Sequence, residues 1–274
     1  MYSTSVATHG DRREILKFLE RRLAHNAWVI QGVHDALQDP QDFWSVVVCR
    51  RRGKVIGAAH VMRVVASQTG YAYAAQMDGA RPQAVEVMTE ALPAGEVGQF
   101  RLFTRPTQRY FDGLPGAERS EGDLFFTVSA QRFRPVAGEE VVEIAEPRSD
   151  LFERCEQQPV WANFDHGGRL FCIVVGGRAV SSAWSSALTP KGPTERRVRT
   201  IGALYTETPY RCKGFGRRLV SHMTERILNG GDVPIYWTEP ENIASQRLCK
   251  SLGFRQYAQE VRYLWCRPGN TSSG

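Results

Sequence analysis

The sequence predicts an α/β chain made of two similar lobes, and three features of its patterning support this expectation. Two pairs of β-branched and apolar segments, within 43–65 and 170–188, each enclose a tight turn and are typical of hairpins. A helix-like segment precedes each pair. Within 198–254 a strand leads through a glycine-bearing loop into a helix. The repeated helix and hairpin indicate an internal duplication, although two unrelated hairpins would give the same pattern.

Composition limits the function classes. The 274 residues are 42% apolar and 23% charged, which fits one large or two modest globular domains and excludes a disordered chain. No apolar run approaches the roughly 18 residues of a membrane span, and the N-terminus lacks the pattern of a signal peptide. We therefore expect a cytoplasmic protein without membrane contact. The net charge of +6 is spread along the chain, so nucleic-acid binding is not favoured.

The six cysteines form no C-x-x-C pair, so we expect reduced thiols and no metal site.

The first half of the chain is expected to contain a helix stabilised by Ile15, Leu16 and Leu19, which recur on one helical face. The elements expected there are a helix at 11–23, strands at 43–49 and 55–65, a helix at 82–92, and a long loop or inter-lobe connection at 104–123. The segment 104–123 is expected to be a loop because it contains many prolines and glycines.

A new unit is expected to begin around Glu139. Ser149 or Asp150 can cap a helix that continues to Gln157, because a short side-chain oxygen satisfies free backbone N–H groups. The other expected elements are strands at 141–145, 170–175, 178–188, 198–206, 233–238 and 260–266, and helices at 215–228 and 242–252.

The loop Arg211-x-x-Gly214-x-Gly216 stands directly before the helix that begins near Phe215. Such a loop directs backbone N–H groups and the positive end of the helix dipole at one place, which suits a diphosphate. It has neither the Gly-Lys-Ser/Thr ending of a nucleotide P-loop nor the G-x-G-x-x-G spacing of a dinucleotide site. By itself such a glycine-rich turn before an amphipathic helix is more often a feature of ordinary packing.

A second motif follows it: Asn242-x-x-Ser245-x-x-Leu248-x-x-x-Leu252-Gly253-Phe254. In this order and spacing the two motifs resemble those of the GNAT N-acetyltransferase superfamily, over roughly 140–266. The resemblance implies a mixed, twisted sheet flanked by helices. It divides the chain into a degenerate GNAT-like lobe at 1–135, an acyl-CoA-binding catalytic domain at 136–266 and a flexible tail at 267–274. Only the second lobe of this tandem has the CoA motif, since no Arg-x-x-Gly-x-Gly follows the first hairpin.

The resemblance implies acetyl-CoA, or another acyl-CoA, as co-substrate, and no metal. Its pantetheine arm is expected where the strand ending at Thr206 splays away from 235–238. Asn242 is equally explained as a helix N-cap. The residues expected to bind the cofactor are Leu204, Tyr205, Thr206, Arg211, Cys212, Lys213, Gly214, Phe215, Gly216, Arg217, Asn242 and Ser245.

Acyl transfer to an amine needs a proton acceptor, for which Glu207 and Glu239 are candidates. A water chain would also serve, and either carboxylate fits a solvated loop charge. The backbone N–H of Thr206 is the candidate oxyanion donor. Many family members have a tyrosine where this chain has Cys249, so the acid that protonates the leaving thiolate is Cys249 or a substitute.

The candidate substitutes for that tyrosine are Tyr236, Tyr257 and water. Cys212 is a second departure, because many members have glycine there, and Pro209 lies one place from its usual offset.

The function expected from this resemblance is transfer of acetyl from acetyl-CoA to a primary amine of a small molecule or amino acid, by direct attack in a ternary complex. The alternatives are a non-enzymatic acyl-CoA-binding regulatory module and a peptide or protein N-acetyltransferase. Trp161, Trp184 and Trp237 are candidates for the acceptor pocket, with burial in the core as the competing interpretation. A monomer and a homodimer are both compatible with the sequence.

Overall fold

The computed structural model describes residues 1–38, 44–64, 66–137, 141–165 and 167–269. They form two compact units, which we call the first and the second unit. The first unit consists of Met1–Asp123, Thr189–Glu195 and Ala258–Gly274, and the second of Leu124–Leu188 and Arg196–Tyr257.

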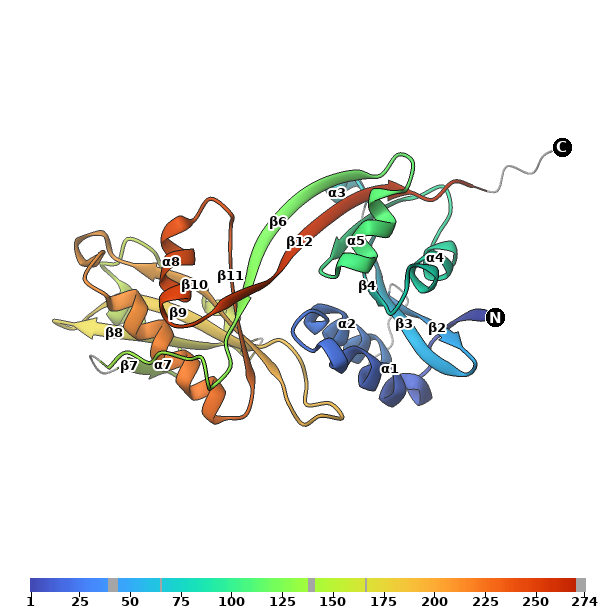
Figure 1. The fold of residues 1–274 in the computed structure, drawn as a ribbon. Helices are drawn as coiled ribbons and strands as arrows, with labels where there is room; N and C mark the ends of the chain where they lie inside the picture. The colour runs from blue at the N-terminus through green and yellow to red at the C-terminus, as the bar shows by residue number, and fades with distance from the viewer. Residues whose placement is uncertain (39–43, 65, 138–140, 166, 270–274) are drawn as a thin grey trace. The chain divides into compact units, whose positions relative to one another are not determined.

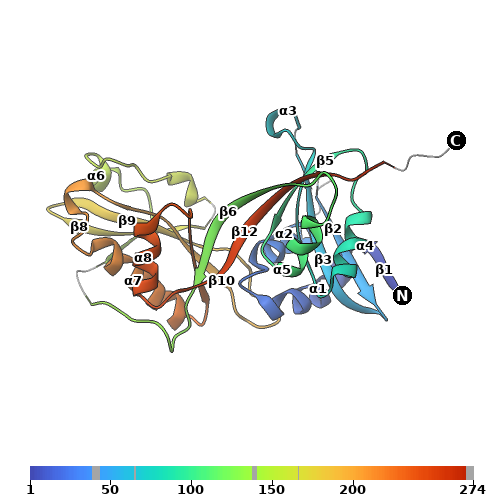
Figure 2. The same ribbon diagram turned by 45° about the horizontal axis from the view of Figure 1, so that its top comes forward.

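The first unit is a sheet with helices on both of its faces (Figures 1 and 2). Its strands, in spatial order, are β1 (Tyr2–Val6), β2 (Trp44–Arg51), β3 (Lys54–Arg63), β4 (Tyr73–Gly79), β5 (Val97–Leu102) and the end of β12 (Arg255–Cys266). Its helices are α1 (Arg12–Leu19), α2 (Ala27–Gln38), α3 (Ala66–Thr69), α4 (Pro82–Glu90) and α5 (Arg105–Asp112). Alternate residues of β2 face opposite sides: Val46 packs with α1 and α2, and Val47 with α4 and α5.

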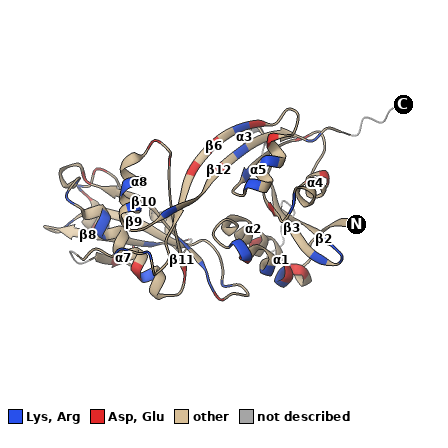
Figure 3. Cartoon of the chain, in the orientation of Figure 1, with Lys and Arg blue, Asp and Glu red and all other residues tan. Residues whose placement is uncertain are grey.

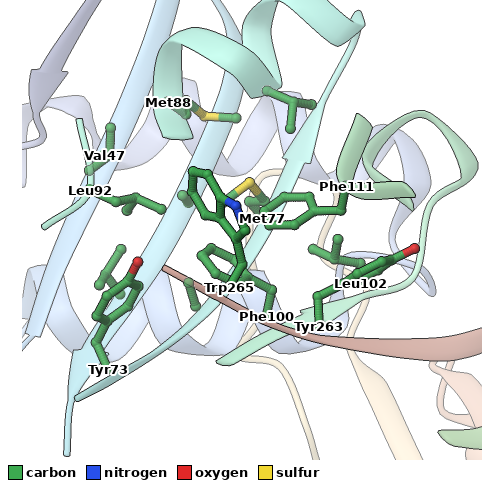
Figure 4. Packing of buried hydrophobic residues seen from close by; sticks show 14 of the residues in the cluster. Val47, Tyr73, Met77, Met88, Leu92, Phe100, Leu102, Phe111, Tyr263 and Trp265 are labelled. Atoms are coloured by element: carbon green, nitrogen blue, oxygen red, sulfur yellow. The ribbon is translucent and has the colours of Figure 1, made fainter. Parts of the chain in front are cut away.

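The last strand of the chain completes the core of the first unit. Val261 to Cys266 of β12 pair antiparallel with β5. This register buries Tyr263 and Trp265, which are 1% and 7% exposed. Both rings pack against Phe111, as Figure 4 shows, with centroids 5.3 Å and 6.1 Å from that ring. The C-terminal strand therefore belongs to the first unit by its packing.

The second unit is a sheet covered by α7 (Phe215–Asn229) and α8 (Ile243–Ser251). Its strands, in spatial order, are the end of β6 (Glu118–Thr127), β11 (Val233–Thr238), β10 (Val198–Thr206), β9 (Arg178–Ala187), β8 (Arg169–Val175) and β7 (Val141–Ile144). Leu219, Met223 and Ile227 recur on the buried face of α7, as the periodicity predicts. A short helix, α6 (Ser149–Phe152), precedes the β8–β9 hairpin.

The two units repeat one order of elements: strand, helix, strand, helix, strand. In the first unit this is β4, α4, β5, α5, β6, and in the second β10, α7, β11, α8, β12. The final strands exchange units. Leu124 to Thr127 of β6 pair with β11, while the end of β12 pairs with β5. The observed units therefore differ from the ranges 1–135 and 136–266, because burial of Phe126 in one core and of Trp265 in the other decides the grouping.

Most expected elements are confirmed to within a few residues, but two expectations are wrong. The loop expected at 104–123 contains α5 and the start of β6. Pro106 stands in the first turn of α5, where its missing N–H costs nothing, and Gly113 ends the helix. The helix expected to continue to Gln157 ends at Phe152, and its N-cap is Arg148.

Some expectations concern residues outside the described part of the chain. These are the unit boundary near Glu139, the strand ends at 43 and 65, and residues 270–274 of the expected tail. Among the described residues, no helix is both long and apolar enough to cross a bilayer.

Replacement of Trp265 by alanine tests the packing role of β12. We expect Trp265→Ala to lower the free energy of unfolding by about 3–5 kcal/mol, since it leaves a large cavity in the first unit. The neighbouring Leu264 is 37% exposed, so Leu264→Ala should cost less than about 1 kcal/mol. Urea unfolding followed by circular dichroism measures both, and equal losses would contradict this role of the strand.

Candidate functional site

The site begins where β10 and β11 separate. The two strands pair in parallel from Val198–Val233 to Ile201–Tyr236. Beyond Ile201, β10 contains a bulge between Gly202 and Tyr205, and Ala203 there has a φ of 49°. A bulge bends its strand and ends regular pairing. Regular pairing of the two strands therefore ends before their carboxyl ends, where the motifs led us to expect the strands to separate.

The loop between β10 and α7 has the backbone that its glycines predict. Gly214 has a φ of 84° and is the N-cap of α7, a conformation that L side chains rarely adopt. Gly216 is buried, and a Cβ there would lie 3.3 Å from Thr206 Oγ1 and 3.4 Å from Leu248. The first N–H groups of a helix have no partner within the helix. They point out of this loop with the positive end of the helix dipole.

A cleft of about 640 Å³ lies beside this loop, within the range of about 300–1,000 Å³ that is usual for ligand pockets. The first residues of both α7 and α8 reach it. Asn242 caps α8, and its side chain accepts a hydrogen bond from the Ser245 N–H at 3.0 Å. The lining residues are Leu204, Tyr205, Thr206, Tyr210, Arg211, Cys212, Gly214, Phe215, Gly216, Arg217, Asn242, Ala244, Ser245 and Leu248. Every residue expected to bind the cofactor lines this cleft except Lys213.

The basic residues of the loop have different environments. Arg211 is held against the strand end: its Nε donates to the Thr206 carbonyl at 2.9 Å, and its guanidinium lies 5.5 Å from the Tyr205 ring centroid. Lys213 lies over the Tyr210 ring. Arg217 is exposed and lines the cleft. Acidic and basic residues occur on many elements of both units (Figure 3), so the positive charge at the cleft comes from this loop rather than from a basic domain.

The carboxylate candidates lie outside the cleft lining. Glu207 is 1% exposed, accepts from the Glu156 N–H at 2.9 Å and pairs with Arg178. Glu239 is exposed in the turn after β11. Thr206 lines the cleft, and its hydroxyl lies 2.9 Å from Ser181 Oγ.

Cys249 lies in the core of the second unit, with 0% of its surface exposed. Its thiol donates to the Gln246 carbonyl at 3.3 Å, and burial raises its pKa to about 12. A buried thiol that is bonded to its own helix does not reach the cleft. This placement does not support Cys249 as the proton donor.

Three lining residues were not among the predicted binding residues: Tyr210, Ala244 and Leu248. Leu248 and the neighbours of Ala244 stand in the second motif, so its spacing could have identified both. Two further residues form hydrogen bonds with lining residues: Tyr236, which the sequence suggested only as a substitute acid, and Glu156, which had no local signal in the sequence. Tyr236 OH lies 2.5 Å from Ser245 Oγ, and Glu156 accepts hydrogen bonds from Tyr205 and Thr208.

The candidate tryptophans contact other aromatic rings. Trp184 is 6% exposed and packs against Phe164, and Trp161 packs against Phe152 and Phe164. Trp237 stacks on Phe125, and its ring lies 3.0 Å from the position of a Cβ on Gly202. The first two have the packing of core residues, while Trp237 lies at the β10 bulge.

Known proteins provide an independent comparison. Residues 193–263, which span β10 to β12, match the family model described as FR47-like protein. No curated protein sequence matches the chain.

Solved structures resemble the chain over nearly its full length. A tandem GNAT protein from the clavulanic acid biosynthesis pathway, without AcCoA, is 14% identical and has a TM-score of 0.57 over 97% of this chain and 98% of its own. A GCN5-related N-acetyltransferase from Sphaerobacter thermophilus is 12% identical, with a TM-score of 0.56 over 98% and 96%. An acetyltransferase of the GNAT family from Colwellia psychrerythraea is 13% identical, with a TM-score of 0.57 over 96% and 99%.

The class of protein follows from the fold and the two motifs together. The resemblance to the GNAT superfamily is confirmed: the chain has the GNAT fold, and residues 193–263 show the sequence pattern of an FR47-like protein. Two of the structures that share this fold are described as a GCN5-related N-acetyltransferase and an acetyltransferase from the GNAT family.

Substitution of Cys212 tests the strain in the loop. Cys212 has a φ of 61°, which costs an L side chain about 1–2 kcal/mol. Glycine removes that cost but loses about 0.5–1 kcal/mol through the freedom of the unfolded chain. We expect Cys212→Gly to raise the free energy of unfolding by about 0.5–1 kcal/mol. Cys212→Ala keeps the strained backbone and should not stabilise. An equal gain in both variants, measured by urea unfolding, would show that the thiol and not the backbone is responsible.

Proposed function

We propose that this chain is an acyl-CoA-dependent N-acyltransferase, which transfers acetyl from acetyl-CoA to a primary amine of a small molecule or amino acid. One observation supports it most: the glycine loop, the parted ends of β10 and β11 and the first turns of two helices all border one cleft. The diphosphate of a coenzyme needs the glycine loop and the first turns of helices. An extended chain with amide groups, such as pantetheine, needs the free edge of a strand.

In this proposal the residues of the loop at 212–217 bind the diphosphate through their backbone N–H groups. Arg217 and Lys213 add positive charge at its exposed side. Arg211 acts differently, because its bond to the Thr206 carbonyl fixes the loop to the strand end. The pantetheine arm lies along Leu204 to Thr206, with Asn242 and Ser245 on the opposite wall.

The reaction is a direct attack in a ternary complex. The amine nitrogen forms a bond to the thioester carbon, the carbon–sulfur bond breaks, and the electron pair leaves with sulfur. The backbone N–H of Thr206 stabilises the oxyanion. Glu239 is the better candidate for the proton acceptor, since both oxygens of Glu207 are already bound, by the Glu156 N–H and by Arg178.

A non-enzymatic acyl-CoA-binding module is the second candidate. The burial of Cys249 favours it, because the position that supplies the acid in many relatives has no access to the cleft. Release of free thiol with any amine excludes this candidate.

Isothermal titration tests the cofactor site. We expect acetyl-CoA to bind at one site per chain, because only the second unit has the glycine loop. The corresponding loop of the first unit, between β4 and α4, consists of Ala80 and Arg81 alone. The residue that follows it, Pro82 at the start of α4, has no backbone N–H to donate to a phosphate. Arg217→Glu should weaken binding about tenfold, by replacing an attraction to phosphate with a repulsion. Arg247→Glu, an equal change at an exposed residue outside the cleft, should leave it unchanged.

Two sites per chain, or equal losses in both variants, would contradict this assignment of the cleft. No binding of acetyl-CoA at micromolar concentration would reject the proposed function itself.

Thiol release with a panel of amines tests the proton acceptor. Loss of a general base typically costs 10²–10⁴-fold, so we expect Glu239→Gln to lower kcat/KM by about 100-fold at neutral pH. Glu207→Gln should mainly lower thermal stability, because it weakens a buried ion pair. The opposite result would make Glu207 the proton acceptor: full activity of Glu239→Gln, together with a large loss of kcat/KM in a Glu207→Gln variant that remains folded.

A further inference from the structure

A pair of hydrogen-bonded hydroxyl groups stands at one wall of the cleft. Ser245 lines the cleft near the start of α8, and Tyr236 projects from β11 into the core behind it. Their oxygens are 2.5 Å apart, the short end of the range for O–H···O bonds. Tyr236 is 2% exposed.

The backbone of Ser245 is fixed as well. Its N–H is bound by Asn242 Oδ1, so the cap of α8 sets where the residue stands. The phenol is the stronger acid of the two hydroxyls and is therefore the better donor. When Tyr236 donates to Ser245 Oγ, the hydrogen of Ser245 is left to point into the cleft.

Two other hydroxyls of the lining, those of Tyr205 and Thr206, already use their hydrogens within the protein. Tyr205 donates to the Glu156 carboxylate. Ser181 Oγ donates to the Tyr205 carbonyl at 3.2 Å, so the bond between Ser181 and Thr206 uses the hydrogen of Thr206. Ser245 differs from these two residues, because its partner Tyr236 is itself able to donate and so to free the Ser245 hydrogen for a ligand.

We propose that Ser245 Oγ donates a hydrogen bond to the sulfur of the leaving thiolate, and that Tyr236 is the positioning residue that orients the Ser245 hydroxyl. This inference rests on the proposed function. Ser245 would then stabilise the thiolate in the cleft, which the buried Cys249 thiol does not reach.

The chemistry is stabilisation without proton transfer. As the carbon–sulfur bond breaks, the electron pair goes to sulfur, and the hydrogen bond from Ser245 stabilises the charge that develops there. The proton lost by the amine goes to the proton acceptor and then to solvent. The thiolate takes a proton from solvent after release. Burial raises the pKa of Tyr236 to about 12, well above the value of about 8.5 for a thiol, so proton transfer from Tyr236 to sulfur is disfavoured.

The test compares single-turnover thiol release with acetyl-CoA binding. A hydrogen bond to a charged group is worth roughly a factor of 10–100, so Ser245→Ala should slow thiol release by about that factor while its Kd for acetyl-CoA changes less than about threefold. Tyr236→Phe should slow thiol release by about three- to tenfold, since it removes only the group that orients the Ser245 hydroxyl. The double variant should be no slower than Ser245→Ala. These losses should be constant from pH 6 to 9, because neither hydroxyl titrates there.

Two further variants are the controls. Ser251→Ala removes a hydroxyl of the same helix that bonds to the Leu248 carbonyl, and it should leave the rate unchanged. Ser245→Thr keeps the hydroxyl and should restore most of the rate, which also tests the proposal if Tyr236→Phe does not fold.

This inference would be overturned if Ser245→Ala released thiol at an unchanged rate, or if the substitution only weakened the binding of acetyl-CoA. Additive losses in the double variant would also overturn it, because they would make Tyr236 act independently of Ser245. Failure of the unsubstituted chain to bind acetyl-CoA is a separate outcome, because it rejects the proposed function before any variant is compared.

Discussion

The separation of β10 from β11 is the constraint on which the site depends. Regular pairing ends at Ile201 and Tyr236, and the bulge that follows turns the strand end away from its neighbour. A continuous pair would close the space beside Leu204 and Thr206. It would also leave the glycine loop without a cleft to face. The positive φ of Ala203 and the Trp237 ring against Gly202 are local features of that opening.

In the first unit, side chains of the protein join the corresponding strand ends. There β4 and β5 also pair in parallel, from Tyr73–Gly98 to Ala75–Phe100. Asp78 near the end of β4 accepts a hydrogen bond from Thr104, just beyond β5, at 3.1 Å. Arg22 and Asn26 also bind this carboxylate. Burial raises the pKa of Asp78, and the charge of Arg22 opposes that shift. The protein's own side chains thus tie the two strand ends together.

Local signals in the sequence predicted the ends of the helices that border the cleft. Gly214 and Gly253 have positive φ values and stand at helix ends, and Asn242 is an N-cap, each as its residue type requires. Capping and turn chemistry depend on a few neighbouring residues, so a single sequence is enough to find them. The helix α5 was missed because Pro106 and Gly113 resemble loop residues, although they stand at its two ends.

Features that depend on distant residues were not predictable in this way. The exchange of final strands depends on where Phe126 and Trp265 become buried, which no neighbouring residues in the sequence determine. The burial of Cys249 and the contact between Tyr236 and Ser245 are likewise products of packing between β11 and α8. The motif supplied the position of Cys249 but not its environment.

The central claim is that backbone N–H groups of the loop at 212–217 hold the diphosphate of a coenzyme. The most direct measurement is the amide spectrum of the nitrogen-15-labelled chain during titration with acetyl-CoA. We predict that the amide signals of these residues shift most, and that desulfo-CoA, which keeps the diphosphate, shifts them equally. Acetyl-CoA binding that leaves these amides unchanged would contradict the account.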